Sequence, residues 1–219
     1  LDRKNLMEPI QAYYKNYAVI FLDKWFKYIE EYQSNQTGKL QEIIDNNPAK
    51  TAIVVGDGVS YEFAQDIIEK VSKEYTLSKE HQYIFAGLPS ETEHNMSQLY
   101  IDSGTVVKDK QDREAYLLKQ NKDKLIGFID LEKVNETSDK EHYLICSYKD
   151  PDKLGETYQH KALKYFDLVA GIFATKIEQL FKNGYQNVYL VTDHGFVLTG
   201  ILDNSDKIEV DFKGIVKIS

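Results

Sequence analysis

The pattern that most constrains the fold is an alternation of short, β-branched apolar runs with longer segments of helical periodicity. The apolar runs predict strands at residues 51–55, 82–86, 125–129, 143–147 and 187–191. The helical spacing between them predicts helices from Tyr61 to Val71, from Thr92 onward, and from Glu156 to a stop at Asn183-Gly184. Such short runs suit parallel strands covered on both faces. The sequence therefore predicts an α/β fold with a mostly parallel sheet flanked by helices.

Two helical patterns precede this alternation. The first runs from about Met7 to Tyr32, and a shorter one near Leu40 to Ile44 stops at the residues before Pro48. We therefore predict a helical lead-in over residues 1–48, packed on a domain that spans residues 49–219. Within that domain, the polar stretch 103–124 fits either a loop or a surface helix.

Charge and composition limit the classes of function. The net charge of −8 argues against a grip on nucleic acid by bulk electrostatics. A phosphate substrate held through metal ions stays compatible with it, because the ions supply positive charge. No apolar stretch approaches bilayer length, and the single Cys146 fits a reducing compartment, so we expect a cytoplasmic protein without a membrane partner. The sixteen tyrosines are spread along the chain, and we interpret most as half-buried packing residues rather than a base-stacking platform.

Acidic or hydroxyl residues follow four of the predicted strands. They are Asp57, Thr92, Asp152 and the pair Asp193-His194. Because ligands of open α/β sheets bind outside the carboxyl ends of the strands, we expect these side chains to meet. Carboxylates together with neutral imidazole suit zinc or manganese. The alternative for any single acid is that it caps the following helix.

Three segments together resemble a known family. In chain order they are AIVVGDGVSYEFA, LPSETEHNM and VYLVTDHGFVLTG, and they resemble the PglZ domain of the alkaline phosphatase superfamily over roughly Thr51 to Gly200. The resemblance implies an alkaline-phosphatase-like fold and a phosphatase or phosphodiesterase that uses divalent ions, zinc or manganese. It also implies a place in bacterial phage defence of the BREX type. A phosphorylated or nucleotide substrate and other defence proteins are then the expected partners.

The resemblance also assigns roles to residues. Asp57, Asp193 and His194 would hold one metal ion, and Thr92 would be the nucleophile, bridging metal and phosphorus. Independently of the resemblance, a threonine at a helix N-terminus sits where backbone N–H groups stabilise negative charge. The alternative is that Thr92 only caps its helix by accepting a hydrogen bond from the Asn95 amide.

The second metal site is expected in the segment after the 143–147 strand. The resemblance gives Asp152 as its aspartate, with Glu156 as a further candidate in the place of a histidine ligand. Two departures from the family pattern stand out. Ser60 replaces an arginine that commonly follows the first aspartate, and no histidine follows His194. We therefore expect a segment truncated at the C-terminus relative to a longer protein, which holds one ion tightly and the other poorly.

Three further interpretations stay open at this point. The fold can serve as a catalytically impaired scaffold in a defence complex, which both departures favour. The Gly-x-Gly turn in VVGDGVS can also belong to a nucleotide or methyl-donor site, although the next predicted strand lacks the acidic end that a ribose would need. Ser90 is the rival hydroxyl to Thr92, and His94 is expected at the surface. Any grip on long DNA would come from other domains or partners.

Overall fold

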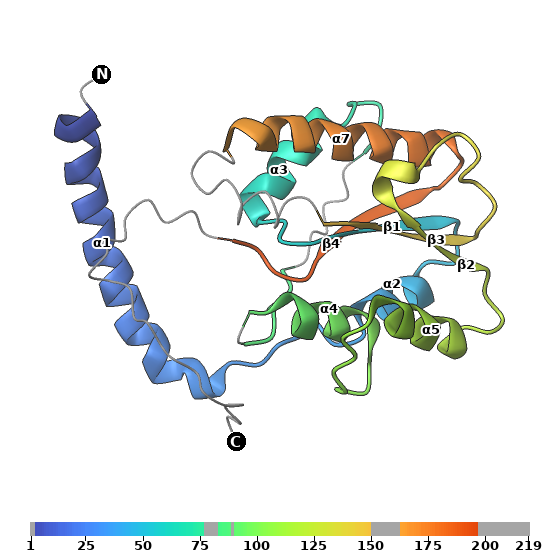
Figure 1. The fold of residues 1–219 in the computed structure, drawn as a ribbon, viewed down its shortest axis with the longest axis horizontal. Coiled ribbons are helices and arrows are strands. Elements are labelled where there is room, and N and C mark those ends of the chain that lie inside the picture. Colours follow the sequence, from blue (N-terminus) through green and yellow to red (C-terminus); the bar gives the residue numbers. More distant parts are fainter. Residues whose placement is uncertain (1–2, 77–82, 89, 150–162, 197–219) are drawn as a thin grey trace. The chain divides into compact units, whose positions relative to one another are not determined.

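The structure is a computed structural model that describes residues 3–76, 83–88, 90–149 and 163–196. The chain divides into two compact units, and one of them spans Gln33–Val197. This unit contains a parallel four-stranded sheet with the order β2-β3-β1-β4 (Figure 1). The strands are β1 (Thr51–Gly56), β2 (Ile126–Asp130), β3 (Tyr143–Tyr148) and β4 (Asn187–Thr192). The predicted α/β fold with a mostly parallel sheet is confirmed.

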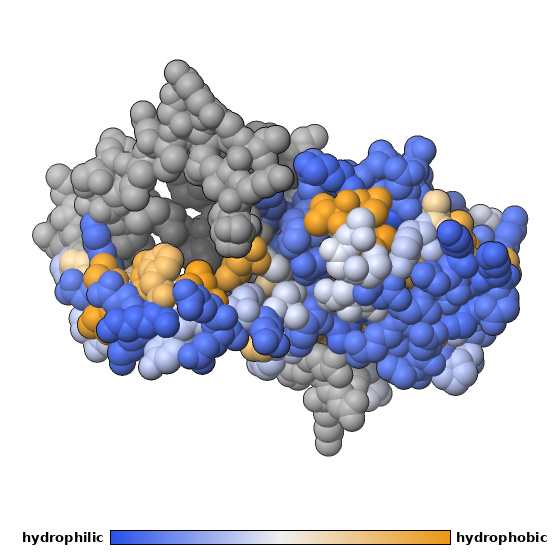
Figure 2. Space-filling model, turned by 90° about the horizontal axis from the view of Figure 1, so that it is seen from below, coloured by the Kyte–Doolittle hydropathy of each residue, from blue (hydrophilic) through white to orange (hydrophobic). Residues whose placement is uncertain are grey.

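Helices cover both faces of this sheet. One face carries α3 (Tyr61–Lys70) and α7 (Leu163–Lys182) (Figure 1). The other carries α2 (Lys39–Asn46), α4 (Thr92–Tyr100) and α5 (Lys110–Gln120). A short 3-10 turn, η2 (Leu131–Lys133), follows β2. The side of the unit with α2, α4 and α5 presents a largely hydrophilic surface (Figure 2).

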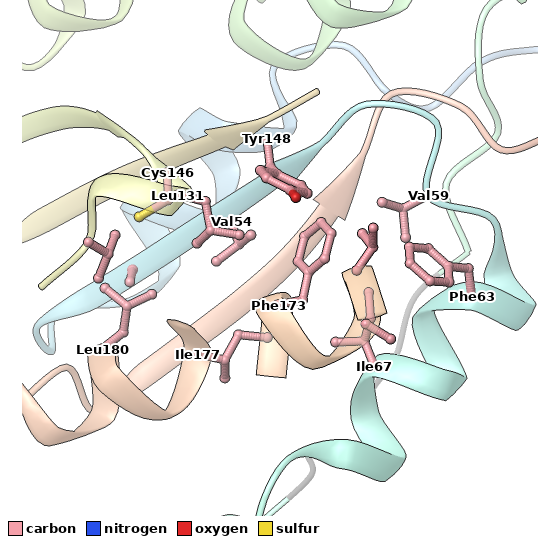
Figure 3. Close-up of a cluster of buried hydrophobic side chains, with 14 of the residues drawn as sticks. Val54, Val59, Phe63, Ile67, Leu131, Cys146, Tyr148, Phe173, Ile177 and Leu180 are labelled. Atoms are coloured by element: carbon pink, nitrogen blue, oxygen red, sulfur yellow. The ribbon is translucent and has the colours of Figure 1, made fainter. Parts of the chain in front are cut away.

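Strand β1 is buried along its whole length because it lies between two apolar clusters. Ala52 and Val54 point into the cluster under α3 and α7, where Phe173 is fully buried (Figure 3). Ile53 and Val55 point into the cluster under α2, α4 and α5. Full burial of one such side chain stabilises the fold by about 1.5–3 kcal/mol. This two-sided burial is why β1 reads as a continuous apolar run.

The end of α7 follows the prediction. Gly184 adopts φ 85°, a left-handed conformation that glycine reaches without strain. Its N–H donates to the Phe181 carbonyl at 2.9 Å, and the Tyr185 N–H donates to the Leu180 carbonyl at 3.2 Å. This pair of bonds satisfies carbonyls that the helix leaves open, and turns the chain back toward β4.

The predicted strand at 82–86 is wrong. Residues 83–86 form no strand, and Tyr83 and Phe85 are exposed. The partly buried Ile84 alternates with these outward rings, which gives strand-like periodicity, but the two backbone bonds that Phe85 makes with Asn35 run to a loop segment and not to a strand of the sheet. The Asn35 N–H donates to the Phe85 carbonyl at 3.2 Å, and the Phe85 N–H donates to Asn35 Oδ1 at 2.6 Å.

The stretch 103–124, which fitted either a loop or a surface helix, contains the helix α5. Asp109 caps this helix by accepting from the N–H groups of Gln111 at 2.7 Å and Asp112 at 3.2 Å.

The N-terminal unit contributes α1 (Arg3–Tyr28) and η1 (Ile29–Glu31). The boundary at residue 48 and the packing of the lead-in on the domain stay predictions. Helix α2 itself belongs to the core of the Gln33–Val197 unit, where Leu40 and Ile44 are buried. Among the described helices, none combines the length and apolar character needed to cross a bilayer.

Candidate metal centre and nucleophile

Strand register brings the two aspartates together. Val55 of β1 and Val191 of β4 are register partners, and both point into the cluster under α4. Asp57 and Asp193 each lie two residues further along the chain. Since side chains alternate between faces with a period of two, both carboxylates emerge at the same edge of the sheet and on the same face. Helix α4 covers that face.

The turns after β1 and β4 are tied to each other. Gly58 adopts φ 67°, and its N–H donates to Asp193 Oδ1 at 3.1 Å. The Thr192 hydroxyl accepts from the Val59 N–H at 3.1 Å and donates to the His194 carbonyl at 2.6 Å. These bonds hold the two turns in a fixed relation, and the left-handed Gly58 turns the backbone N–H toward the carboxylate.

Thr92 reaches this pair from α4. Its Oγ1 lies 3.3 Å from Asp57 Oδ1 and 2.9 Å from His194 Nε2. The capping alternative does not hold, because Glu91 occupies the N-cap position and the Asn95 N–H donates to the Glu91 carbonyl at 2.9 Å. The hydroxyl faces the Asp57 carboxylate and the His194 imidazole instead of the helix backbone.

The three side chains fit a single divalent ion. Asp57, Asp193 and His194 each offer one ligand atom, and these atoms all lie within 4.8 Å of one another. His194 Nε2 lies 3.8 Å from Asp57 Oδ1 and 3.4 Å from Asp193 Oδ2. Ligand atoms about 2.1 Å from a tetrahedral ion lie about 3.4 Å apart, so the arrangement needs only a small contraction. Carboxylate oxygen with imidazole nitrogen is a donor set that suits zinc or manganese.

One buried oxygen gives independent support for a cation. Asp193 is 1% exposed, and its Oδ2 accepts no hydrogen bond from any described residue. His194 Nε2 is near it, but without hydrogen-bond geometry. A buried carboxylate oxygen without a partner is unfavourable, because water no longer solvates it. A bound cation would supply the missing interaction.

Electrostatics agree with this view. Burial raises the pKa of the Asp193 carboxyl to about 6, although His194 opposes the shift. The neighbouring Asp57 charge adds to the rise in pKa, while the backbone N–H groups of Gly58 and His194 lower it. Two carboxylates in one buried place disfavour each other's ionised form, and a cation between them reverses that preference.

Of the predicted site residues, Asp57, Thr92, Asp193 and His194 come together. Asp152 and Glu156 lie outside the described residues. The other hydroxyl and thiol side chains of interest lie elsewhere: Ser90 is exposed, and Cys146 is a buried core residue whose pKa burial raises to about 12. His94 is half-buried, with its Nε2 2.8 Å from Gln98 Nε2.

Sequence reasoning missed two residues that hold the site. Gln36 is fully buried, and its Nε2 donates to the Asp193 carbonyl. It lies in the segment before α2, where no motif marks it. Thr192 ties the two turns together, and a hydroxyl at the end of an apolar strand is a weak signal that could have pointed to it.

Fold and site together define an alkaline-phosphatase-like α/β domain with a carboxylate–imidazole cluster at the carboxyl edge of its sheet. The sequence matches the family described as the BREX system PglZ alkaline phosphatase-like domain over residues 37–178. This match covers well over half of the chain, so the chain belongs to the PglZ family. The matched range includes Asp57 and Thr92 and ends before Asp193. A comparison with curated proteins finds no match.

Proposed function

We propose that this chain is a metal-dependent phosphoesterase domain in which Thr92 is the nucleophile. One observation carries the proposal: the Thr92 hydroxyl lies 3.3 Å from Asp57 Oδ1 and 2.9 Å from His194 Nε2. The three residues come from separate segments, so their meeting follows from the fold. Membership of a family described as alkaline phosphatase-like supports the same chemistry, since alkaline phosphatases are metal-dependent phosphoesterases.

The reaction follows from the groups around Thr92. Its oxygen would form a bond to phosphorus while the bond to the leaving alcohol breaks, and the hydroxyl proton would end on that alcohol. Water would then cleave the phospho-threonine, which releases the phosphate product and restores the hydroxyl. Thr92 begins α4, so the open backbone N–H groups of the first turn would face a phosphoryl group bound to its oxygen. Asp57, Asp193 and His194 would hold the divalent ion, which would stabilise negative charge on phosphoryl oxygens and would lower the pKa of the hydroxyl.

The remaining parts of the proposal extend beyond the described site. Asp152 would serve a second ion, with Glu156 as a further candidate. We infer zinc or manganese as the metal, and a phosphorylated or nucleotide substrate. The family description supports a place in a BREX-like defence system. We infer a cytoplasmic location, with other defence proteins as partners. Those partners would supply any grip on long DNA.

The test compares two hydroxyl variants of the same loop-to-helix segment. Hydrolysis of p-nitrophenyl phosphate and of bis-p-nitrophenyl phosphate is measured with added zinc or manganese. We expect Thr92→Ala to lower kcat at least about a thousandfold, because the covalent step is lost. Ser90→Ala is the matched control, since Ser90 is exposed and only two residues away, and it should retain native turnover.

Metal binding separates loss of the nucleophile from loss of the site. We expect Thr92→Ala to retain at least one equivalent of zinc by elemental analysis, because Asp57, Asp193 and His194 remain. Turnover that survives Thr92→Ala with metal bound would remove Thr92 from the nucleophile role.

A non-catalytic scaffold is the second candidate function, and Ser60 favours it. This residue stands where the family pattern commonly has an arginine, and its hydroxyl accepts from the Phe63 N–H at 3.2 Å as the N-cap of α3. A hydroxyl that caps a helix therefore stands where the family pattern commonly has a positively charged side chain. Absence of turnover by metal-loaded protein on both phosphate esters, with intact metal binding, would favour the scaffold.

A further inference from the structure

Two exposed tyrosine rings from separate segments, Tyr61 and Tyr83, meet at the surface of the Gln33–Val197 unit. Tyr61 is 50% exposed and Tyr83 is 66% exposed. Their ring centroids lie 5.7 Å apart with an interplanar angle of 36°. Both depart from the expectation that tyrosines of this chain are half-buried packing residues. Large rings held together at the surface leave aromatic faces available to a ligand.

The ring pair belongs to the edge of the sheet that carries the centre. Tyr61 is the first residue of α3, four positions after Asp57. The residue before it, Ser60, packs so closely on Gly195 that a Cβ at Gly195 would lie 3.2 Å from Ser60 Cα. Gly195 directly follows His194. The start of α3 is thereby fixed against the turn that carries the imidazole.

Tyr83 approaches from the segment that leads into α4. Ile84, the next residue, packs against the cluster under α4, which anchors this part of the segment. The hydrogen bonds between Phe85 and Asn35 hold it further. The two rings thus stand on the segment that follows Asp57 and on the segment that leads into the helix of Thr92.

We propose that Tyr61 and Tyr83 form a stacking platform for the nucleobase of a nucleoside phosphate ester. The inference rests on the proposed phosphoesterase function and names its substrate class. Stacking of a base on an aromatic side chain tolerates any base, because every base has a π-face. It needs no positive charge, which matters for a chain with a net charge of −8.

The test compares two esters with the same leaving group. Thymidine 5′-(p-nitrophenyl phosphate) carries a base, and methyl p-nitrophenyl phosphate does not. For native protein we expect a lower KM for the thymidine ester. The ratio of the two KM values should change about five- to tenfold in Tyr61→Leu and in Tyr83→Leu, with kcat on the thymidine ester retained. Tyr61→Phe keeps the ring and should restore the native ratio.

A control and a binding measurement complete the test. Tyr17→Leu removes an exposed tyrosine of α1 and should leave the KM ratio at its native value. Zinc-loaded Thr92→Ala protein is titrated calorimetrically with thymidine monophosphate and with methyl phosphate, which reports base binding without turnover. An unchanged KM ratio in both leucine variants, or equal affinity for the two phosphates, would overturn the platform.

The binding measurement also separates the two proposals. If no ester is hydrolysed but thymidine monophosphate binds and Tyr61→Leu weakens it, the phosphoesterase function fails and the platform stands. If both esters are hydrolysed through Thr92 with the same KM, the phosphoesterase function stands and the platform fails.

Discussion

The two outer strands of the sheet, β2 and β4, each lead to an aspartate at the carboxyl end, and the two carboxylates have opposite electrostatic environments. Asp130, the last residue of β2, is half exposed and lies 2.7 Å from Lys133 Nζ and 3.3 Å from Lys110 Nζ. Its hydrogen bonds with these lysines lower its pKa. Asp193, directly after β4, is buried, pairs with no lysine or arginine among the described residues, and has a raised pKa.

This difference in charge partners distinguishes an acid with a structural role from a candidate metal ligand. The lysines already compensate the charge of Asp130, so that edge of the sheet needs nothing further. The charge of Asp193 is compensated only in part, by His194 and by the Gly58 N–H. Position at a strand end is common to both residues. The missing counter-charge is what makes the β1–β4 edge the candidate place for a cation.

The strongest way to break the comparison is to neutralise each acid in turn. We expect Asp193→Asn to lower zinc affinity more than about 100-fold, because loss of a ligand exceeds the 10- to 100-fold effect of an outer-sphere partner. Asp130→Asn should leave zinc affinity within about twofold of native, because its carboxylate is satisfied by lysines. Competition with a chromophoric chelator measures both. A comparable loss in the two variants would show that the two edges form one site.

The pH dependence of metal-free protein should have opposite signs at the two acids. Asp193 has its pKa raised from 3.8 to about 6. Its contribution to stability is therefore present below about pH 4 and is lost as pH rises through about 6. The upper bound is about 3 kcal/mol, since the shift is about two units at 1.36 kcal/mol each. For Asp130, with a lowered pKa, the contribution is present above its unfolded pKa and is lost as pH falls.

Urea unfolding of native protein and of the two asparagine variants measures this contrast. The difference in unfolding free energy between native and Asp193→Asn protein should fall from about pH 4 to about pH 7. Saturating zinc should remove that fall, because a bound cation favours the ionised carboxylate. A difference that rises with pH in metal-free protein would mean that Asp193 is already compensated.

A smaller effect is expected at Gln36, the buried partner of the Asp193 carbonyl. We expect Gln36→Leu to lower zinc affinity about tenfold, because an outer-sphere group that orients ligands is typically worth 10- to 100-fold. Gln41→Leu is the matched control: Gln41 lies in α2 and bonds to Asp45 and Asn121, away from the centre. Equal affinities in the two variants would show that Gln36 only fills space.

Most of the fold could be predicted because local patterns are strong where tertiary context agrees with them. The strand β1 reads as buried because both of its faces are covered, and Gly184 ends α7 by a rule of backbone conformation. The stretch 83–86 misled because its alternation reflects one inward residue between two exposed rings. Periodicity reports burial, and it does not reveal whether a neighbouring strand is available for pairing.

The residue types of the candidate site could be predicted from the sequence, but the strand register and the buried polar residues that hold the site in place could not. Asp57 and Asp193 were expected to meet because carboxyl ends of parallel strands share an edge. Their meeting on one face depends on the pairing of Val55 with Val191, and no local pattern encodes that register. Gln36 was missed for the same reason, since its partner lies 157 positions away in the sequence. Long-range contacts of single polar groups leave no periodic trace.

The smallest effect should come from the counter-charge of Asp130 itself. Lys133 is 73% exposed and lies one helical turn after Asp130. We expect Lys133→Ala to lower the unfolding free energy by less than about 1 kcal/mol, since solvent screens an exposed pair and Lys110 still faces the carboxylate. Urea unfolding at low and high salt measures it, and the difference should shrink at high salt. A change in zinc affinity in this variant would contradict the contrast between the two edges, because it would couple the lysine pair to the centre.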